Sequence, residues 1–159
     1  MTRSRVWQPP AWYVYPAGRL GFLAELRAGG VRPAQTRINR AQRAHRGGFQ
    51  VEFDLTVPGL PARHVRILFA GIGSAPFVHA DGPAESRHRY TDGSLCMWYP
   101  FDPKEARWTR REGAAALLGH ITAHLLREEW WRMTGEWVGD EVTHDDEPDE
   151  DYVDGKKLA

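Results

Sequence analysis

An alternation of apolar and polar side chains over residues 49–57 constrains the fold of this chain more than any other feature. Every second residue from Phe49 is apolar, and glutamine, glutamate, aspartate and threonine stand between. Successive side chains of a strand point to opposite faces of a sheet, so the pattern predicts a strand with one buried face. Pro58-Gly59 opens a short loop, and residues 65–70 predict the returning strand of a hairpin.

The segments before and after the hairpin complete a meander. Leu20, Leu23 and Leu26 have helical spacing over residues 19–28, and Gly29 ends this predicted helix. The arginine-rich stretch that follows, up to Gly48, has no clean period. It is either an irregular connection or a weak edge strand. After a turn at residues 71–76, residues 77–79 predict a short third strand.

The C-terminal half predicts a long helix. Thr109 and Glu112 have the spacing of a capping box at a helix start, and Gly135 marks the end. Its apolar face is formed by Ala114, Leu117, Leu118, Ile121 and Leu125. Antiparallel strands with helices before and after them predict an α+β layered domain.

Aromatic residues are concentrated at the two ends of the predicted domain. Prolines over residues 6–16 exclude a helix interior, so we expect an extended segment that packs its rings on the body. Trp130, Trp131 and Trp137 are expected to fill the core or cover the sheet. A partner surface at these tryptophans is the alternative.

The balance of 21 basic and 21 acidic residues hides an asymmetry along the chain. Nine of the acidic residues lie from Asp140 onward, where they face only two lysines. We therefore predict a domain over residues 1–139 and an acidic tail over residues 140–159 with too few apolar residues to pack. Six arginines crowd one early segment: Arg27, Arg32, Arg37, Arg40, Arg43 and Arg46. We favour a solvated positive face there over a nucleic-acid partner.

A single cysteine limits the chemistry. It excludes an internal disulfide and a cysteine-based structural zinc site. No run of residues reaches the length of a membrane span, and the N-terminus lacks the apolar stretch of a signal peptide. We therefore expect a cytoplasmic protein with no membrane partner, no cofactor and no metal.

The residues leading to that cysteine carry a family resemblance. Ser86-Arg87-His88 is followed by Tyr90, and then by Asp92-Gly93-Ser94-Leu95-Cys96. This segment resembles the active site of ubiquitin-conjugating enzymes, where a His-Pro-Asn triplet precedes Gly-x-Ile/Leu-Cys. Aligned on Cys96, the triplet falls on residues 86–88, so His88 replaces the asparagine, as in the divergent prokaryotic branch of that family. Trp108 stands where the family has a tryptophan. The resemblance implies the ubiquitin-conjugating fold.

The resemblance also implies a reaction. Cys96 would carry the C-terminal acyl group of a protein as a thioester and pass it to an amine. His88 would stabilise the oxyanion or help remove the amine's proton. Asp102 would orient the incoming lysine, and Tyr90 and Asp92 would support the site. Prokaryotic relatives occur in antiphage defence operons with cyclic-oligonucleotide signalling (CBASS), where a nucleotidyltransferase is the conjugated partner, or beside ubiquitin-like proteins. A separate activating enzyme is expected.

Two other function classes stay open at this point. The chain is either a transferase or a non-catalytic binding module on the same fold, and a cysteine hydrolase using Cys96 and His88 is a third, disfavoured reading. His120 and His124 stand four apart on the predicted helix, which is a metal-ligand spacing. Ile121 stands where a metalloprotease needs glutamate, so core or surface histidines are expected there instead.

Overall fold

The computed structural model describes residues 11–39, 48–70, 75–82, 85–98 and 102–139. The element order is η1 (Trp12–Val14), α1 (Pro16–Ala28), β1 (Gln35–Asn39), β2 (Gly48–Leu55), β3 (Arg63–Ala70), β4 (Phe77–Ala80), η2 (Lys104–Ala106), η3 (Arg110–Glu112) and α2 (Gly113–Thr134). The predicted α+β class is confirmed. In the described residues, no helix is long and apolar enough to cross a membrane.

The four strands form one antiparallel sheet in the order β1-β2-β3-β4. Phe49 pairs with Phe69, and Val51 pairs with Ile67, so the hairpin has the register that the alternation requires. The arginine-rich segment contributes the edge strand β1, which was one of the two alternatives. Arg40, Arg43 and Arg46 lie outside the described residues.

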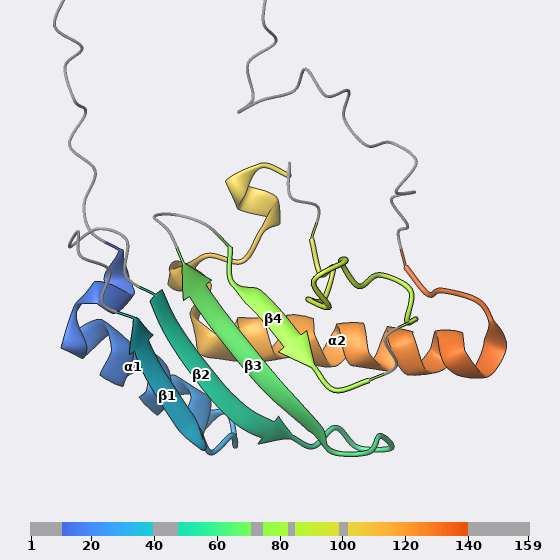
Figure 1. Ribbon diagram of the computed structural model, residues 1–159, viewed down its shortest axis with the longest axis horizontal. Helices are drawn as coiled ribbons and strands as arrows, with labels where there is room; N and C mark the ends of the chain where they lie inside the picture. The colour runs from blue at the N-terminus through green and yellow to red at the C-terminus, as the bar shows by residue number, and fades with distance from the viewer. Residues whose placement is uncertain (1–10, 40–47, 71–74, 83–84, 99–101, 140–159) are drawn as a thin grey trace, which may run out of the picture.

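Both long helices lie on the same side of the sheet (Figure 1). The helices cover the face of the sheet that holds the buried apolar residues of β2 and β3, whereas the open face carries charged groups such as Glu52, Asp54 and Arg66. The buried residues are Phe49, Val51, Phe53, Leu55, Val65, Ile67 and Phe69. Phe22 and Leu26 of α1 are fully buried. Leu20 is 64% exposed although it shares a helical spacing with Leu26, because three leucines at spacing three drift around a helix, and Phe22 occupies the core.

Of the aromatic segment predicted over residues 6–16, residues 6–10 lie outside the described residues; the aromatics of the described part pack on the body, but not in an extended conformation. Residues 12–14 form a turn of 3-10 helix, and Trp12 contacts the rings of Phe22, Phe49 and Phe69. The proline at the first helical position then begins α1, a place where its missing N–H costs nothing.

The capping box exists, but it does not begin the long helix. Thr109 and Glu112 cap the short turn η3, in which the Glu112 carboxylate accepts the Thr109 N–H at 2.6 Å. Gly113 interrupts the helix with φ +80°, and α2 is capped instead by Glu25 of α1, which accepts the Ala114 N–H at 2.8 Å. All five predicted apolar residues of α2 are buried, and Gly135 ends the helix in the left-handed region.

Trp108 joins the helices to the sheet. The ring is buried beside Phe22 and Phe69, and its indole N–H donates to the Gly113 carbonyl at 2.8 Å. Of the three later tryptophans, Trp130 is 47% exposed, so the expectation that it fills the core or covers the sheet is wrong. Its position on the outer face of α2 leaves it in solvent. Trp131 and Trp137 are half-buried.

Candidate functional site

A braced turn presents the cysteine. Gly93 adopts φ +82°, which a side chain would disfavour, and donates its N–H to the Tyr90 carbonyl at 2.8 Å. The Asp92 carboxylate accepts the Ser94 N–H at 2.9 Å and the Ser94 hydroxyl at 2.6 Å. These bonds, the hydroxyl first, hold the pKa of Asp92 below its ordinary value. Asp92 therefore shapes the turn as an ionised carboxylate.

Backbone bonds then fix Cys96 against the sheet edge. The Leu95 N–H donates to the Val78 carbonyl of β4 at 2.7 Å, and the Cys96 N–H donates to the His88 carbonyl at 2.8 Å. Cys96 is half-buried, and its Sγ lies 4.0 Å from the Trp98 carbonyl oxygen. The thiol is thus held at a defined place at the end of a pinned turn.

Tyr90 closes the loop from the other side. Its hydroxyl donates to the Trp98 carbonyl at 3.0 Å, and its backbone N–H donates to the Ser94 carbonyl at 2.9 Å. The same tyrosine therefore holds the chain on both sides of Cys96. Tyr90 therefore braces the loop, and its support of the reaction at Cys96 stays a prediction.

His88 occupies an unusual backbone conformation. It is the only non-glycine residue with a positive φ (59°) in the described part of the chain. Asparagine, aspartate and histidine enter this region more readily than other side chains, but any non-glycine residue there is uncommon. Its ring is nearly buried and packs on Trp137, with the ring centroids 4.3 Å apart. The bond that joins His88 to Cys96 runs through its backbone carbonyl.

An ion pair beneath the loop was missed by the sequence analysis. Arg89 donates from Nε and Nη2 to the two carboxylate oxygens of Glu128 on α2, at 2.9 and 3.0 Å. The Arg89 Nη1 also donates to the Ala80 carbonyl at the end of β4 (2.6 Å). The two side chains are 6% and 5% exposed. Glu128 continues the buried face of α2. Acidic residues are almost never buried without a partner, so this position could have indicated a buried cation from the sequence alone.

His124 is the second missed feature. It is 2% exposed, its ring lies 5.5 Å from that of Trp137, and its Nε2 has no hydrogen-bond partner. Burial lowers the pKa of His124 to about 4, so the ring is neutral near pH 7. His120 is exposed and meets Trp98 edge-on. His124 is thus a core histidine and His120 a surface one.

Asp102 lies in the loop that follows the cysteine. It is half-buried and lies just beyond residues 99–101, which are outside the described residues. Its role in orienting a lysine stays a prediction. Among the described residues, no cluster of three or more histidine, cysteine, aspartate or glutamate side chains could hold a metal ion.

The fold and this loop define a class: an α+β domain that presents one braced cysteine between its sheet edge and a long helix. The family model of the Type II CBASS E2 protein matches residues 37–145, more than half of the chain. The chain therefore belongs to this family of E2-like antiphage defence proteins. No curated protein and no solved structure matched it in our comparisons.

Proposed function

We propose that this protein is an E2-like acyl transferase that carries a protein C-terminus as a thioester on Cys96 and passes it to an amine. The observation that supports this most is the braced, half-buried Cys96, held by the His88 carbonyl in a member of the CBASS E2 family. A turn fixed by so many backbone bonds places the sulfur before a substrate arrives, which is what nucleophilic catalysis needs.

In the first step, the Cys96 thiolate forms a bond to the activated C-terminal carbonyl carbon, and the activating group leaves. A separate E1-like activating enzyme supplies that activated C-terminus. The donor is a ubiquitin-like protein or the C-terminus of a CBASS nucleotidyltransferase. In the second step, an amine attacks the thioester carbon, loses its proton, and expels the Cys96 thiolate.

His88 is proposed to serve the second step. Attack by the amine builds a tetrahedral oxyanion, and a donor aimed at that oxygen lowers the barrier. The conformation of His88 fits the replacement of the family's asparagine, because asparagine also tolerates positive φ. A non-catalytic binding module would form no adduct, and neither would Cys96→Ala. The Cys96→Lys variant described next therefore distinguishes the transferase from the binding module.

The test uses Cys96→Lys, which turns a labile thioester into a stable amide. Purified with its operon partners, this variant should accumulate an adduct that survives thiols and hydroxylamine, whereas the wild-type adduct should be cleaved by both. Equal adduct yield on Cys96→Ala would overturn the proposal. Release of free donor instead of transfer would favour the hydrolase.

The role of His88 is tested with variants that respect its backbone. Alanine at φ 59° adds strain, so His88→Gly is the better side-chain deletion and His88→Asn the better rescue. His88→Gly should still load Cys96 but discharge it about 10²–10³ more slowly, the usual cost of one oxyanion donor. His88→Asn should recover much of that loss. Discharge by His88→Gly at the wild-type rate would contradict the role.

A further inference from the structure

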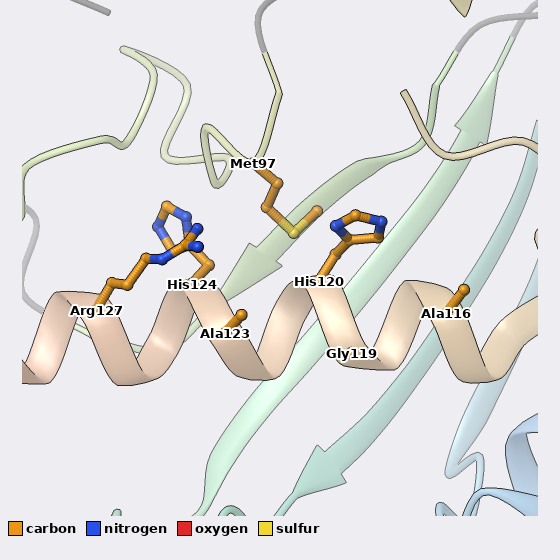
Figure 2. A pocket seen from close by; sticks show the side chains of 7 residues that line it. All are labelled: Met97, Ala116, Gly119, His120, Ala123, His124 and Arg127. Carbon is orange, nitrogen blue, oxygen red and sulfur yellow. The ribbon is translucent and has the colours of Figure 1, made fainter. Parts of the chain in front are cut away.

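A small pocket opens between α2 and the residue that follows the cysteine. It has a volume of about 230 Å³ and is lined by Met97, Ala116, Gly119, His120, Ala123, His124 and Arg127. Figure 2 shows Met97 reaching down from the loop towards the helix, while His120, His124 and Arg127 rise from α2. The three small residues at helical spacing leave the space between these side chains.

The charge of this pocket is uncompensated. Arg127 is exposed and makes no hydrogen bond or ion pair among the described residues, and none of the lining residues is acidic. The next carboxylate along the helix, Glu128, is already held by Arg89. A Cβ on Gly139 would lie 3.3 Å from the Arg127 Nε, so the glycine leaves room for the guanidinium.

The buried His124 adds a second and independent feature. Its Nε2 is buried and has no hydrogen-bond partner, although buried polar atoms in proteins are almost always satisfied. Because His124 lines the pocket, a small movement of the pocket wall would let an acceptor from outside reach this nitrogen. The ring is neutral near pH 7, and as the Nε2–H tautomer it can donate one hydrogen bond to an acceptor.

We propose that this pocket is a subsite for the carboxylate of an acidic side chain in the protein substrate that reacts at Cys96. One guanidinium and one neutral imidazole match a single negative charge better than a phosphate dianion. Met97 adjoins Cys96, and an extended chain advances about 3.3–3.6 Å per residue. The acidic residue would thus lie within a few residues of the group bound to the sulfur. The proposal rests on the proposed function for the identity of that substrate.

The binding test does not need the chemistry. The full-length Cys96→Ala protein, with ¹⁵N-labelled histidines and ¹³C-labelled methionine methyls, is titrated by NMR with N-acetylglutamate α-amide. Saturable shifts should appear at the Met97 methyl and at the His124 ring nitrogens, and they should be absent with N-acetylglutamine α-amide. Arg127→Gln should weaken the binding about tenfold or more, as expected for the loss of a charge-assisted hydrogen bond.

Arg132→Gln is the matched control, because it removes the same charge from the same helix where the arginine pairs with Glu129. It should bind the glutamate probe like the parent. Equal shifts with the glutamine probe, an unchanged affinity in Arg127→Gln, or tighter binding of inorganic phosphate would each overturn the subsite.

A second arm shows which substrate supplies the carboxylate. With Cys96 restored and the operon partners present, slow loading in Arg127→Gln would place the acidic residue in the donor. Normal loading with slow discharge would place it in the acceptor. Normal loading and discharge, despite binding of the probe, would contradict a role at Cys96. Failure of the proposed function is recognised separately, because the protein with Cys96 restored would then form no adduct, while the Cys96→Ala protein would still bind the probe.

Discussion

The ion pair between Arg89 and Glu128 should be one of the largest single contributions to the stability of this domain. It links the residue after His88 to the C-terminal half of α2, and the two side chains are almost fully buried. Removing one member of such a pair leaves the other charge buried and uncompensated, at a cost of about 3–5 kcal/mol. Glu128→Gln keeps the shape of the side chain and removes the charge.

The assay is equilibrium unfolding in urea, followed by tryptophan fluorescence. With a slope of about 2 kcal/mol/M, typical of domains of this size, the midpoint of Glu128→Gln should fall by roughly 2 M. The double variant Arg89→Met/Glu128→Leu should lose much less than the sum of Arg89→Met and Glu128→Leu, because no charge is left unpaired. Arg132→Gln, in an exposed pair, should change the stability by less than about 1 kcal/mol.

The Arg89–Glu128 pair also determines how the stability of the domain changes at low pH. Burial raises the pKa of Glu128, but the hydrogen bonds and charge of Arg89 outweigh it and hold the pKa below its ordinary value. The stabilisation is therefore present above the unfolded carboxyl pKa, about 4.3, and lost as the pH falls through the folded one. In the urea assay, a decrease of less than about 1 kcal/mol in the free energy of unfolding of Glu128→Gln would refute this reasoning. So would a double variant whose loss equals the sum of the losses in Arg89→Met and Glu128→Leu.

Three further predictions follow, two from the packing of the described residues and one from the composition of the acidic tail. Trp108→Ala should destabilise the domain by about 3–5 kcal/mol, whereas Trp130→Ala, at an exposed position, should change it by less than about 0.5 kcal/mol in the same urea assay. Because burial lowers the pKa of His124 to about 4, the wild type should lose on the order of 3 kcal/mol as the pH falls from about 6.5 to 4, a loss that His124→Leu should remove. Deleting residues 140–159 should leave the melting temperature nearly unchanged; a drop of many degrees would move the domain boundary.

The sheet and the long helix could be predicted because their signals are local. The alternation from Phe49 and the apolar stripe of α2 each follow from one period, and burial matches both. The start of α2 could not be predicted in this way. Its cap is Glu25, which lies 89 residues from Ala114 in the sequence and reaches it only through the packing of the two helices.

In the candidate site, too, only the contiguous residues could be predicted from the sequence. The turn from Tyr90 to Cys96 was recognisable because its residues are contiguous and carry family-like choices. The surroundings of His88 could not be recognised, because they come from distant parts of the sequence. Arg89 binds Glu128, 39 residues away, and Trp137, beyond the end of α2, contacts the ring of His88. Only the three-dimensional structure shows that His124 is buried there with an orphaned nitrogen.

The central claim is that the sulfur of Cys96 carries the acyl group, and peptide mapping of the wild-type adduct tests it most directly. Wild-type protein is purified with its operon partners, digested at low pH without thiols, and analysed by mass spectrometry. The account predicts that the C-terminal residues of the donor are joined to the peptide containing Cys96. Hydroxylamine should cleave this bond, so that the mass of the donor residues disappears from the peptide. A link on a lysine or on any residue other than Cys96, or a link that resists hydroxylamine, would contradict it.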